Sequence, residues 1–329
     1  MKRNLKTLLY LLSMSVLLWT SCSKNENPVV VEKDTEQEKY LKSLNEYKKS
    51  DHSLMFAYYR TWRDIATDPT QNQTSMKDLP DSLDLVFVFP DFTPEGSPYW
   101  DSLRTSYVPY LRERGTKVIM TAGINALLNK EYANNEDGYK QLAKKLYEDN
   151  VAKFNLDGFD IDFEQSLSKE EQERAIGVTK ALSQYMGPKS KTGKLLIYDT
   201  NRDGTNTLFE PISEYLDYIL VQSYGRSSSD QSLQNTFNTY ASFLHPSKYL
   251  IGFSFYEENS SYSWNDTNPI LENSRAYAYA KWQPTQGKKG GIFSYAVDRD
   301  GIPDGENRIL KPTYEVTKQL ISTMNPPKK

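Results

Sequence analysis

Short hydrophobic runs recur along the chain and alternate with stretches of amphipathic, helical periodicity. From about Tyr40 onward the runs follow one another at intervals of roughly 25 to 40 residues, which is typical of repeated strand and helix units. The eight predicted strands are 53–62, 83–92, 116–125, 156–165, 194–201, 218–225, 249–256 and 290–297. Several are hydrophobic almost throughout, as expected of parallel strands that are covered on both faces.

The stretches between these strands have an apolar side and a polar side and predict helices. They are 99–114, 138–154, 169–185, 233–244, 273–282 and 312–324. Strand and helix in alternation close most simply as an α/β fold of the (β/α)₈ TIM-barrel type. An open doubly wound sheet is the alternative, but no glycine-rich phosphate-binding turn follows the first strand. We therefore expect one barrel domain over residues 39–329.

The N-terminus has the composition of an export signal. A positively charged start precedes a mostly apolar stretch, 8–19, and small residues then lead to Cys22. The apolar stretch is too short to span a bilayer as a stable helix. Because Cys22 is the only cysteine, no disulfide can form within the chain, and its position resembles the acceptor site of a bacterial lipoprotein. The alternative is an ordinary signal peptide with an incidental cysteine, since Trp19 fits that site imperfectly.

These features predict a signal peptide at 1–21 and a segment, 22–38, made of the lipidated cysteine and a polar tether. A lipid on Cys22 would place the protein in a bacterial membrane as a secreted lipoprotein. The outer membrane, with the barrel exposed at the cell surface, is the expected location. We expect the protein to be a monomer.

Composition adds two constraints. The chain has 24 Tyr, 13 Phe and 5 Trp, more rings than a core requires, which is compatible with stacking against sugars. The formal charge of −3 includes three cations of the predicted signal peptide, and no basic tract occurs elsewhere. We therefore expect no nucleic-acid partner.

Catalytic residues of a TIM barrel lie at the C-terminal ends of its strands. The predicted strand ends carry acids, amides and aromatic rings, a mixture that suits a carbohydrate because hydroxyls need donors and acceptors while sugar faces need rings. These residues are Arg60, Trp62, Asp91, Asn125, Asp162, Glu164, Asp199, Asn201, Gln222, Tyr224, Tyr256, Glu257, Tyr295 and Asp298.

Three acids share one face of the fourth predicted strand. Side chains alternate along a strand, so Asp160, Asp162 and Glu164 point into the barrel, about 7 Å apart from one to the next. Like charges at this spacing force at least one carboxyl to keep a proton near neutral pH, as a general acid must. The alternative is an ion-pair network with Lys or Arg inside the barrel, but neighbouring strand ends supply few cations.

The run Asp157-x-x-Asp160-x-Asp162-x-Glu164 matches the DxxDxDxE signature of glycoside hydrolase family 18, on the strand where that family carries it. The chain resembles this family over nearly the whole predicted barrel. Tyr224 at the end of the sixth strand agrees, as does the glycine pair that opens the eighth.

This resemblance implies a role for each residue of the motif. Glu164 would be the acid/base, and Asp162 would hold and stabilise the substrate's acetamido group. Asp160 would share a proton with Asp162, and Tyr224 would donate to the acetamide oxygen. Asp157 would be structural, because its position puts it on the other face of the strand.

The position of the acids agrees with the mechanism of the family. Ordinary retaining glycosidases place two carboxyls on opposite sides of the scissile bond, about 5 Å apart. Here the candidates share one strand and one side. This suits a substrate-assisted reaction, in which the N-acetyl oxygen of the substrate attacks the anomeric carbon.

The residues at two positions indicate which activity of the family to expect. Chitinases of the family show Met-x-Tyr-Asp on the sixth strand and Trp on the eighth, whereas this chain has Gln222 and Tyr295. These residues resemble the endo-β-N-acetylglucosaminidase branch, which cuts the GlcNAc-β1,4-GlcNAc core of N-glycans on glycoproteins. A chitinase and an inactive surface glycan-binding barrel are the alternatives. Further residues expected to bind substrate are Asn125, Tyr256 and Asn201.

The sequence predicts no metal and no cofactor. His52 and His245 are the only histidines and stand near strand starts, so we interpret both as surface or packing residues. The run 298–301 has two acids and a glycine, as in a calcium loop, but lacks the other ligands and favours a plain turn.

Overall fold

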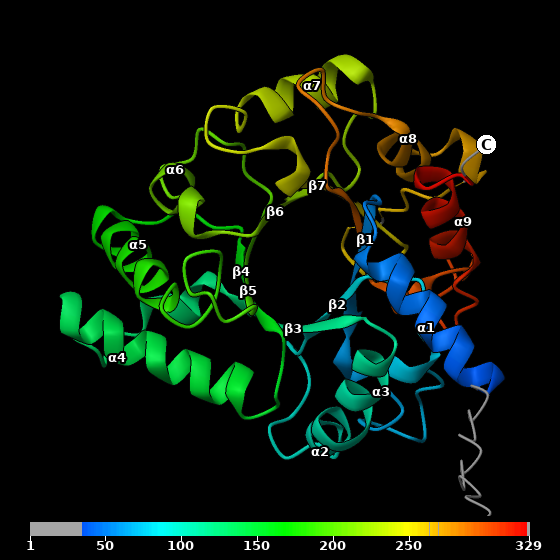
Figure 1. Ribbon diagram of the computed structural model, residues 1–329, viewed down its shortest axis with the longest axis horizontal. Coiled ribbons are helices and arrows are strands. Elements are labelled where there is room, and N and C mark those ends of the chain that lie inside the picture. The colour runs from blue at the N-terminus through cyan, green and yellow to red at the C-terminus, as the bar shows by residue number, and fades with distance from the viewer. Residues whose placement is uncertain (1–34, 263, 269, 328–329) are drawn as a thin grey trace, which may run out of the picture.

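The protein folds as a closed barrel of eight parallel strands, each paired with its neighbours in chain order (Figure 1). The computed structural model describes residues 35–262, 264–268 and 270–327. The predicted signal peptide and Cys22 lie outside these residues. Within the described part of the chain, no helix is long and apolar enough to cross a membrane.

Each of the eight predicted strands contains one strand of the barrel, so the predicted TIM-barrel fold is confirmed. The strands are β1 (Leu54–Arg60), β2 (Leu85–Phe89), β3 (Lys117–Gly123), β4 (Gly158–Phe163), β5 (Leu195–Thr200), β6 (Tyr218–Gln222), β7 (Tyr249–Ser254) and β8 (Gly291–Tyr295). The polar residues at the C-terminal sides stand in the last positions of the strands, as Asp162, Asp199 and Gln222 do, or directly after them, as Glu164 does.

Helices surround the barrel and occur in all six stretches predicted for them. They are α2 (Tyr99–Ser102), α3 (Val108–Glu113), α4 (Glu136–Tyr147), α5 (Lys169–Leu182), α6 (Phe209–Ile212), α7 (Asp230–Asn238), α8 (Arg275–Lys281) and α9 (Glu315–Met324). The short helix α6 lies outside the predicted stretches. The stretch 99–114 is interrupted by a π-helical turn, Leu103–Tyr107. The stretch predicted at 233–244 is shorter and shifted, because α7 begins at Asp230 and ends at Asn238.

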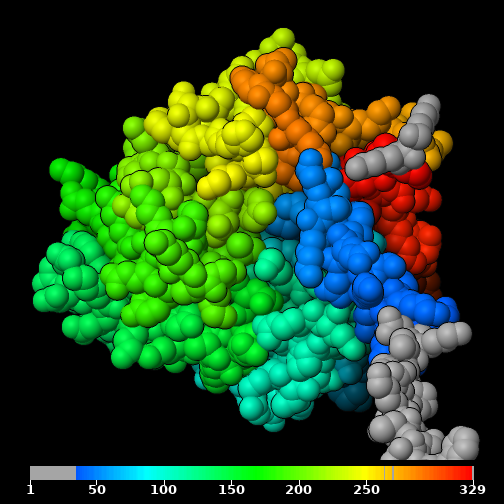
Figure 2. Space-filling model, in the orientation of Figure 1, coloured from blue at the N-terminus to red at the C-terminus, as the bar shows by residue number. Residues whose placement is uncertain are grey.

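The first helix, α1 (Glu36–Lys49), begins inside the segment expected to be a tether. A capping box between Thr35 and Glu38 fixes its start. Figures 1 and 2 show α1, in blue, between the C-terminal helix α9 and the region of α3. Asn45 donates to the carbonyl of Glu113 at the end of α3, so α1 is fastened at the N-terminal side of the barrel.

The N-terminal side of the barrel is held by a repeated contact. An aspartate just before each of β2, β4 and β6 accepts a hydrogen bond from a backbone N–H of the preceding strand. The pairs are Asp84 with Met55, Asp157 with Val118 and Asp217 with Leu196, each at 2.9 Å. Asp157 also pairs with Arg112. The predicted structural role of Asp157 is therefore confirmed, and the contact explains why it belongs to the motif without facing the site.

Large side chains fill the lower interior of the barrel and form a floor for the site above. The buried cluster consists of Phe56, Tyr58, Leu85, Phe87, Ile119, Ile197, Leu220, Leu250 and Phe293. Gly252 leaves room for the ring of Phe293, since a Cβ at this position would lie 2.3 Å from it. The polar residues of β4 to β6 lie above this floor, toward the C-terminal ends of the strands.

Candidate active site

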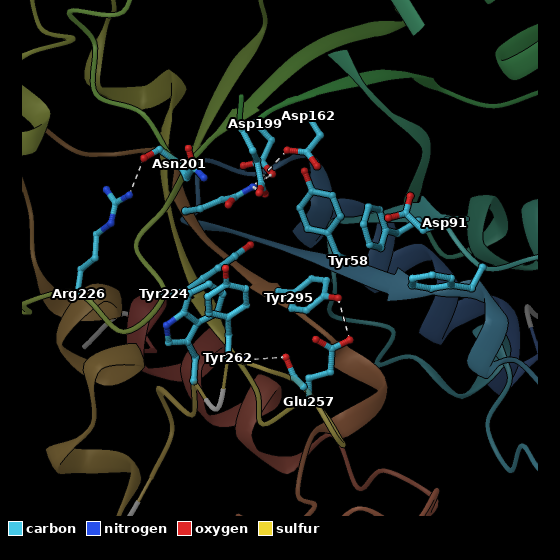
Figure 3. Close-up of a pocket in the computed structure, with 16 residues that line it drawn as sticks. Tyr58, Asp91, Asp162, Asp199, Asn201, Tyr224, Arg226, Glu257, Tyr262 and Tyr295 are labelled. Carbon is cyan, nitrogen blue, oxygen red and sulfur yellow. Dashed lines mark hydrogen bonds between the residues drawn. The ribbon is translucent and has the colours of Figure 1, made fainter. Parts of the chain in front are cut away.

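A cavity of about 370 Å³ opens at the C-terminal ends of the strands (Figure 3). Acids and amides line its floor, and aromatic rings line its walls. The lining residues are Tyr58, Phe89, Asp91, Phe92, Asp162, Glu164, Asp199, Asn201, Gln222, Tyr224, Arg226, Glu257, Ser260, Tyr262, Trp264 and Tyr295. Of the nine residues given a catalytic or substrate-binding role from the sequence, six are therefore brought together here: Asp162, Glu164, Asn201, Gln222, Tyr224 and Tyr295.

Three other sequence candidates lie elsewhere. Asp160 is buried directly below the cavity, as its position on β4 requires. Asn125 is outside the lining, and its side-chain oxygen accepts from Gln165 at 2.9 Å. Tyr256 is also outside, and its hydroxyl donates to Asn307 at 3.1 Å. The structure thus gives the side chains of Asn125 and Tyr256 partners outside the cavity and does not bring them into its lining.

Asp160 occupies the deepest position of the acidic ladder. Its Oδ2 accepts from the hydroxyl of Tyr58 at 2.7 Å and from Thr121 at 3.0 Å. Its Oδ1 is buried without a hydrogen-bond partner among the described residues. Burial raises the pKa of Asp160 to about 7, so this carboxyl holds its proton far more firmly than an exposed aspartate.

Asp162 lies one step higher and faces the cavity. Burial, the negative charge of Glu164 and that of Asp160 together raise the pKa of Asp162 to about 8. Asp160 and Asp162 therefore retain a proton near neutral pH. This agrees with the expectation that crowding on β4 keeps at least one carboxyl protonated.

Gln222, at the end of β6, connects the acids at the ends of the two preceding strands, β4 and β5. Its Nε2 lies 2.7 Å from Glu164 Oε1, 2.8 Å from Asp199 Oδ2 and 3.3 Å from Asp162 Oδ1. Glu164 itself is exposed at the mouth of the cavity, where it can reach a ligand. The amide thus orients the acid/base candidate without covering it.

Asp199 is a site residue that the sequence did not single out. It is buried on β5, and the strand register pairs it with Asp162 on β4. Burial, followed by the charges of Asp162 and Asp160, raises the pKa of Asp199 well above its usual range. Its position at the end of a predicted strand was the only signal for it. Fourteen residues shared such a position, so this signal could not distinguish Asp199 from the others.

Aromatic rings form one wall above the acids. The ring of Tyr224 lies 6.0 Å from that of Tyr295 and 5.6 Å from that of Trp264. Tyr262 stacks on Trp264 at 4.8 Å. Gly225 adopts a φ of +66°, and a Cβ there would lie 2.6 Å from the Trp264 ring, so glycine permits this close approach.

The groups considered for other chemistry have structural roles. His52 lies at the N-terminal side of the barrel, 2.9 Å from Asp84, and His245 caps a short 3₁₀ turn by accepting from Ser247. The acidic run at 298–301 begins in another 3₁₀ turn, where Asp298 pairs with Arg60. Within residues 35–262, 264–268 and 270–327, no group of three or more potential ligands could hold a metal ion.

Comparison with known proteins identifies similar sequences over most of the chain. Residues 57–294 match the family described as the TIM-barrel domain of endo-β-N-acetylglucosaminidase EndoS. The chain is 44% identical over 328 residues to endo-β-N-acetylglucosaminidase F2 of Elizabethkingia meningoseptica, covering 96% of this chain and 97% of that protein. It is 35% identical to endo-β-N-acetylglucosaminidase EndoSd of Streptococcus dysgalactiae, covering 89% of this chain but only 38% of that longer protein.

A solved structure is similar as well. The endo-β-N-acetylglucosaminidase of Cordyceps militaris superposes with a TM-score of 0.84 at 46% identity, covering 89% of this chain and 97% of that one. A variant of that fungal protein, with an Asp→Asn and a Glu→Gln change two positions apart, was solved with fucosyl-N-acetylglucosamine-Asn. The same spacing separates Asp162 from Glu164.

Proposed function

The chain belongs to the endo-β-N-acetylglucosaminidase TIM-barrel family and is a glycoside hydrolase, and from this premise we propose that it hydrolyses the GlcNAc-β1,4-GlcNAc bond in the core of N-glycans, with retention of configuration. The observation that carries the proposal is the group of carboxyls around Gln222. Glu164 is exposed beside two carboxyls, Asp160 and Asp162, that retain a proton between them, in a cavity walled by aromatic rings.

In the first step, the acetamide oxygen of the substrate forms a bond to the anomeric carbon while the bond to the leaving oxygen breaks. Glu164 gives its proton to that oxygen, and Asp162 stabilises the positive charge that develops on the acetamide. The products of this step are a cyclic oxazolinium on the released glycan and a GlcNAc that stays on the protein. Glu164 then takes a proton from water, which opens the ring and restores the β configuration.

The contacts below Asp162 support this division of roles. Asp160 is hydrogen-bonded only through Oδ2 within the described chain, so its other oxygen can exchange a proton with a neighbouring carboxyl. Tyr224 is half-buried beside the acids, where its hydroxyl can donate to the acetamide oxygen. Tyr295 offers a ring to the sugar bound over the barrel.

The leaving group we propose is a GlcNAc linked to Asn of a glycoprotein. The fungal relative that binds fucosyl-N-acetylglucosamine-Asn supports this assignment. The segment between β7 and β8 adds support, because its described residues form one short α-helix, α8, and a 3₁₀ turn, Leu271–Asn273, and no additional domain that would roof the cavity. A folded polypeptide can then approach the mouth of the site.

Incubation with an N-glycosylated protein tests the proposal. Mass analysis should find a free glycan that ends in one GlcNAc and a protein that keeps one GlcNAc. If the purified protein instead degrades chitin oligomers and leaves glycoproteins intact, it is a chitinase. If it binds glycans and cleaves neither substrate, it is a glycan-binding barrel.

We further propose that the mature protein is anchored through a lipid on Cys22 in the outer membrane of a bacterium. The charged start, the apolar stretch 8–19 and the single cysteine after it support this proposal. In the native host, the wild-type protein should partition with membranes on detergent extraction, whereas a Cys22→Ala variant should not be lipidated. Equal solubility of the two proteins would contradict the anchor.

A further inference from the structure

A cluster of six charged side chains, four of them buried, lies beside the cavity, outside the catalytic acids. Arg60 is its centre, with an exposed fraction of 1%. The acidic members are Glu257, Glu258 and Asp298, and the other basic members are Arg63 and Arg299. Three positive and three negative charges balance, which is a condition for keeping such a group out of water.

Arg60 reaches three separate carboxylates with one side chain. Its Nη1 lies 2.9 Å from Glu257 Oε1, and its Nη2 lies 2.8 Å from Glu258 Oε2. Its Nε and Nη2 form a two-pronged contact with the carboxylate of Asp298, at 3.0 and 2.5 Å. Arg60 ends β1, whereas the acids lie in the loops after β7 and β8. The planar guanidinium therefore fixes three loop starts relative to one another.

The cluster extends into the cavity through Glu257. This residue lines the cavity, and its side chain is 25% exposed. Its Oε1 accepts from Arg60 and also from the hydroxyl of Tyr295 at 3.1 Å, as Figure 3 shows for Tyr295. Its Oε2 accepts no hydrogen bond from any described residue and remains available to a ligand hydroxyl. Arg60 thus fixes the position of Glu257 Oε2 and, through the contact of Glu257 with the Tyr295 hydroxyl, the position of the Tyr295 ring.

The backbone after β8 shows that the loop is held in place. Ala296, directly after Tyr295, has a left-handed φ of +54°, which residues other than glycine rarely adopt. Such a conformation persists only where the surrounding contacts enforce it. Asp298, two residues further on, supplies the contact by pairing with Arg60.

From these contacts we infer that Arg60 is a positioning residue for the substrate: through Glu257 and Asp298 it sets the wall of the cavity where the Glu257 carboxylate receives a sugar hydroxyl and the Tyr295 ring receives a sugar face. The inference rests on the proposed function, because it concerns how the same cavity holds its glycan. Arg60 does not touch the reacting atoms, and its influence is expected in substrate binding more than in the chemical step.

A double-mutant cycle between Arg60→Lys and Glu257→Ala tests this, with an Asn-linked biantennary glycopeptide as substrate. Lysine keeps the charge balance but cannot make the same set of contacts, so KM should rise about tenfold while kcat changes little, the size expected for one lost polar contact. In the Glu257→Ala background, Arg60→Lys should have a much smaller effect on KM. Equal effects of Arg60→Lys in both backgrounds would overturn the inference.

Arg112→Gln is the matched control, because Arg112 pairs with Asp157 at the opposite end of the barrel. Its KM should equal that of the wild type. A merely structural role for Arg60 would lower the melting temperature of Arg60→Lys without moving KM.

Amide hydrogen exchange provides a readout that does not depend on activity. In Arg60→Lys, exchange should accelerate in the segments 255–260 and 296–300 and stay unchanged in 124–128. Unchanged exchange in the two loop segments would overturn the inference even if the wild type cleaves the glycopeptide. A wild type that fails to cleave, with exchange accelerated as expected, would remove the proposed function and leave the positioning contact intact.

Discussion

Gln222 at the end of β6 holds Glu164, the residue directly after β4 and two strands away, with its amide nitrogen 2.7 Å from Glu164 Oε1. The same nitrogen lies within 3.3 Å of oxygens of Asp162 and Asp199, yet it carries only two hydrogens. Three ionised carboxylates could not all be satisfied by this one group. The arrangement is therefore stable only while protons are shared among the acids, which links the position of Gln222 to the chemistry.

Replacing Gln222 by Met tests this link, because Met has a similar size but no donor. The carboxyls of Asp162, Glu164 and Asp199 would lose the hydrogen bonds that the Gln222 amide donates. We therefore expect the free energy of unfolding to fall by about 1–3 kcal/mol. Turnover should fall as well, since Glu164 is no longer oriented. Urea denaturation and steady-state kinetics on a glycopeptide measure the two effects. A Gln222→Met variant with wild-type turnover would show that the amide does not orient Glu164.

Glu164→Gln removes the proton donor while keeping the shape of the side chain. Turnover should decrease by about 10²–10⁴, the range typical of lost acid/base catalysis, and glycan binding should survive. Steady-state kinetics and calorimetric titration with a glycopeptide separate the two quantities. Nearly unchanged turnover would rule out Glu164 as the acid/base.

Asp162→Asn tests whether the acetamide oxygen of the substrate is the nucleophile. A neutral amide cannot stabilise the charge of an oxazolinium as a carboxylate does, so kcat should fall sharply while KM changes less. A thiazoline that mimics the cyclic intermediate should inhibit the wild type and bind the variant more weakly. If the thiazoline does not inhibit the wild type, the reaction does not proceed through the substrate acetamide.

The strands could be predicted because each is buried on both faces, so that hydrophobic runs such as 83–89 mark them directly. Helix α1 could not, since none of its residues is buried and its sequence resembles a solvated tether. Only the capping box at Thr35 and Glu38 signalled its start.

The acidic ladder of β4 followed from side-chain alternation along one strand. The residues that contact these acids could not be predicted in the same way, because their positions depend on how the strands pair and close into a barrel. Asp199 meets Asp162 only through the β4–β5 register, and Tyr58 meets Asp160 only because the barrel closes. Trp264 reaches the site through a loop whose path no periodic pattern encodes.

Asp199 leads to a prediction on pH and stability. Burial raises the pKa values of Asp160 and Asp162 to about 7 and about 8, and the pKa of Asp199 is also raised. The unfolded chain releases the same protons near pH 4, about the ordinary value for an aspartate. Between these limits the folded protein binds more protons than the unfolded chain. The stability from these groups is therefore complete below about pH 4 and is lost as pH rises toward 8.

Asp199→Asn removes one of the interacting carboxyls and should make this loss smaller. The free energy of unfolding of the variant should therefore fall less than that of the wild type between about pH 5 and 8. Thermal melts across this pH range measure the difference. Asp137→Asn, on the exposed side of α4, is the control and should follow the wild-type curve. Parallel curves for Asp199→Asn and the wild type would mean that Asp199 holds no proton in the folded barrel.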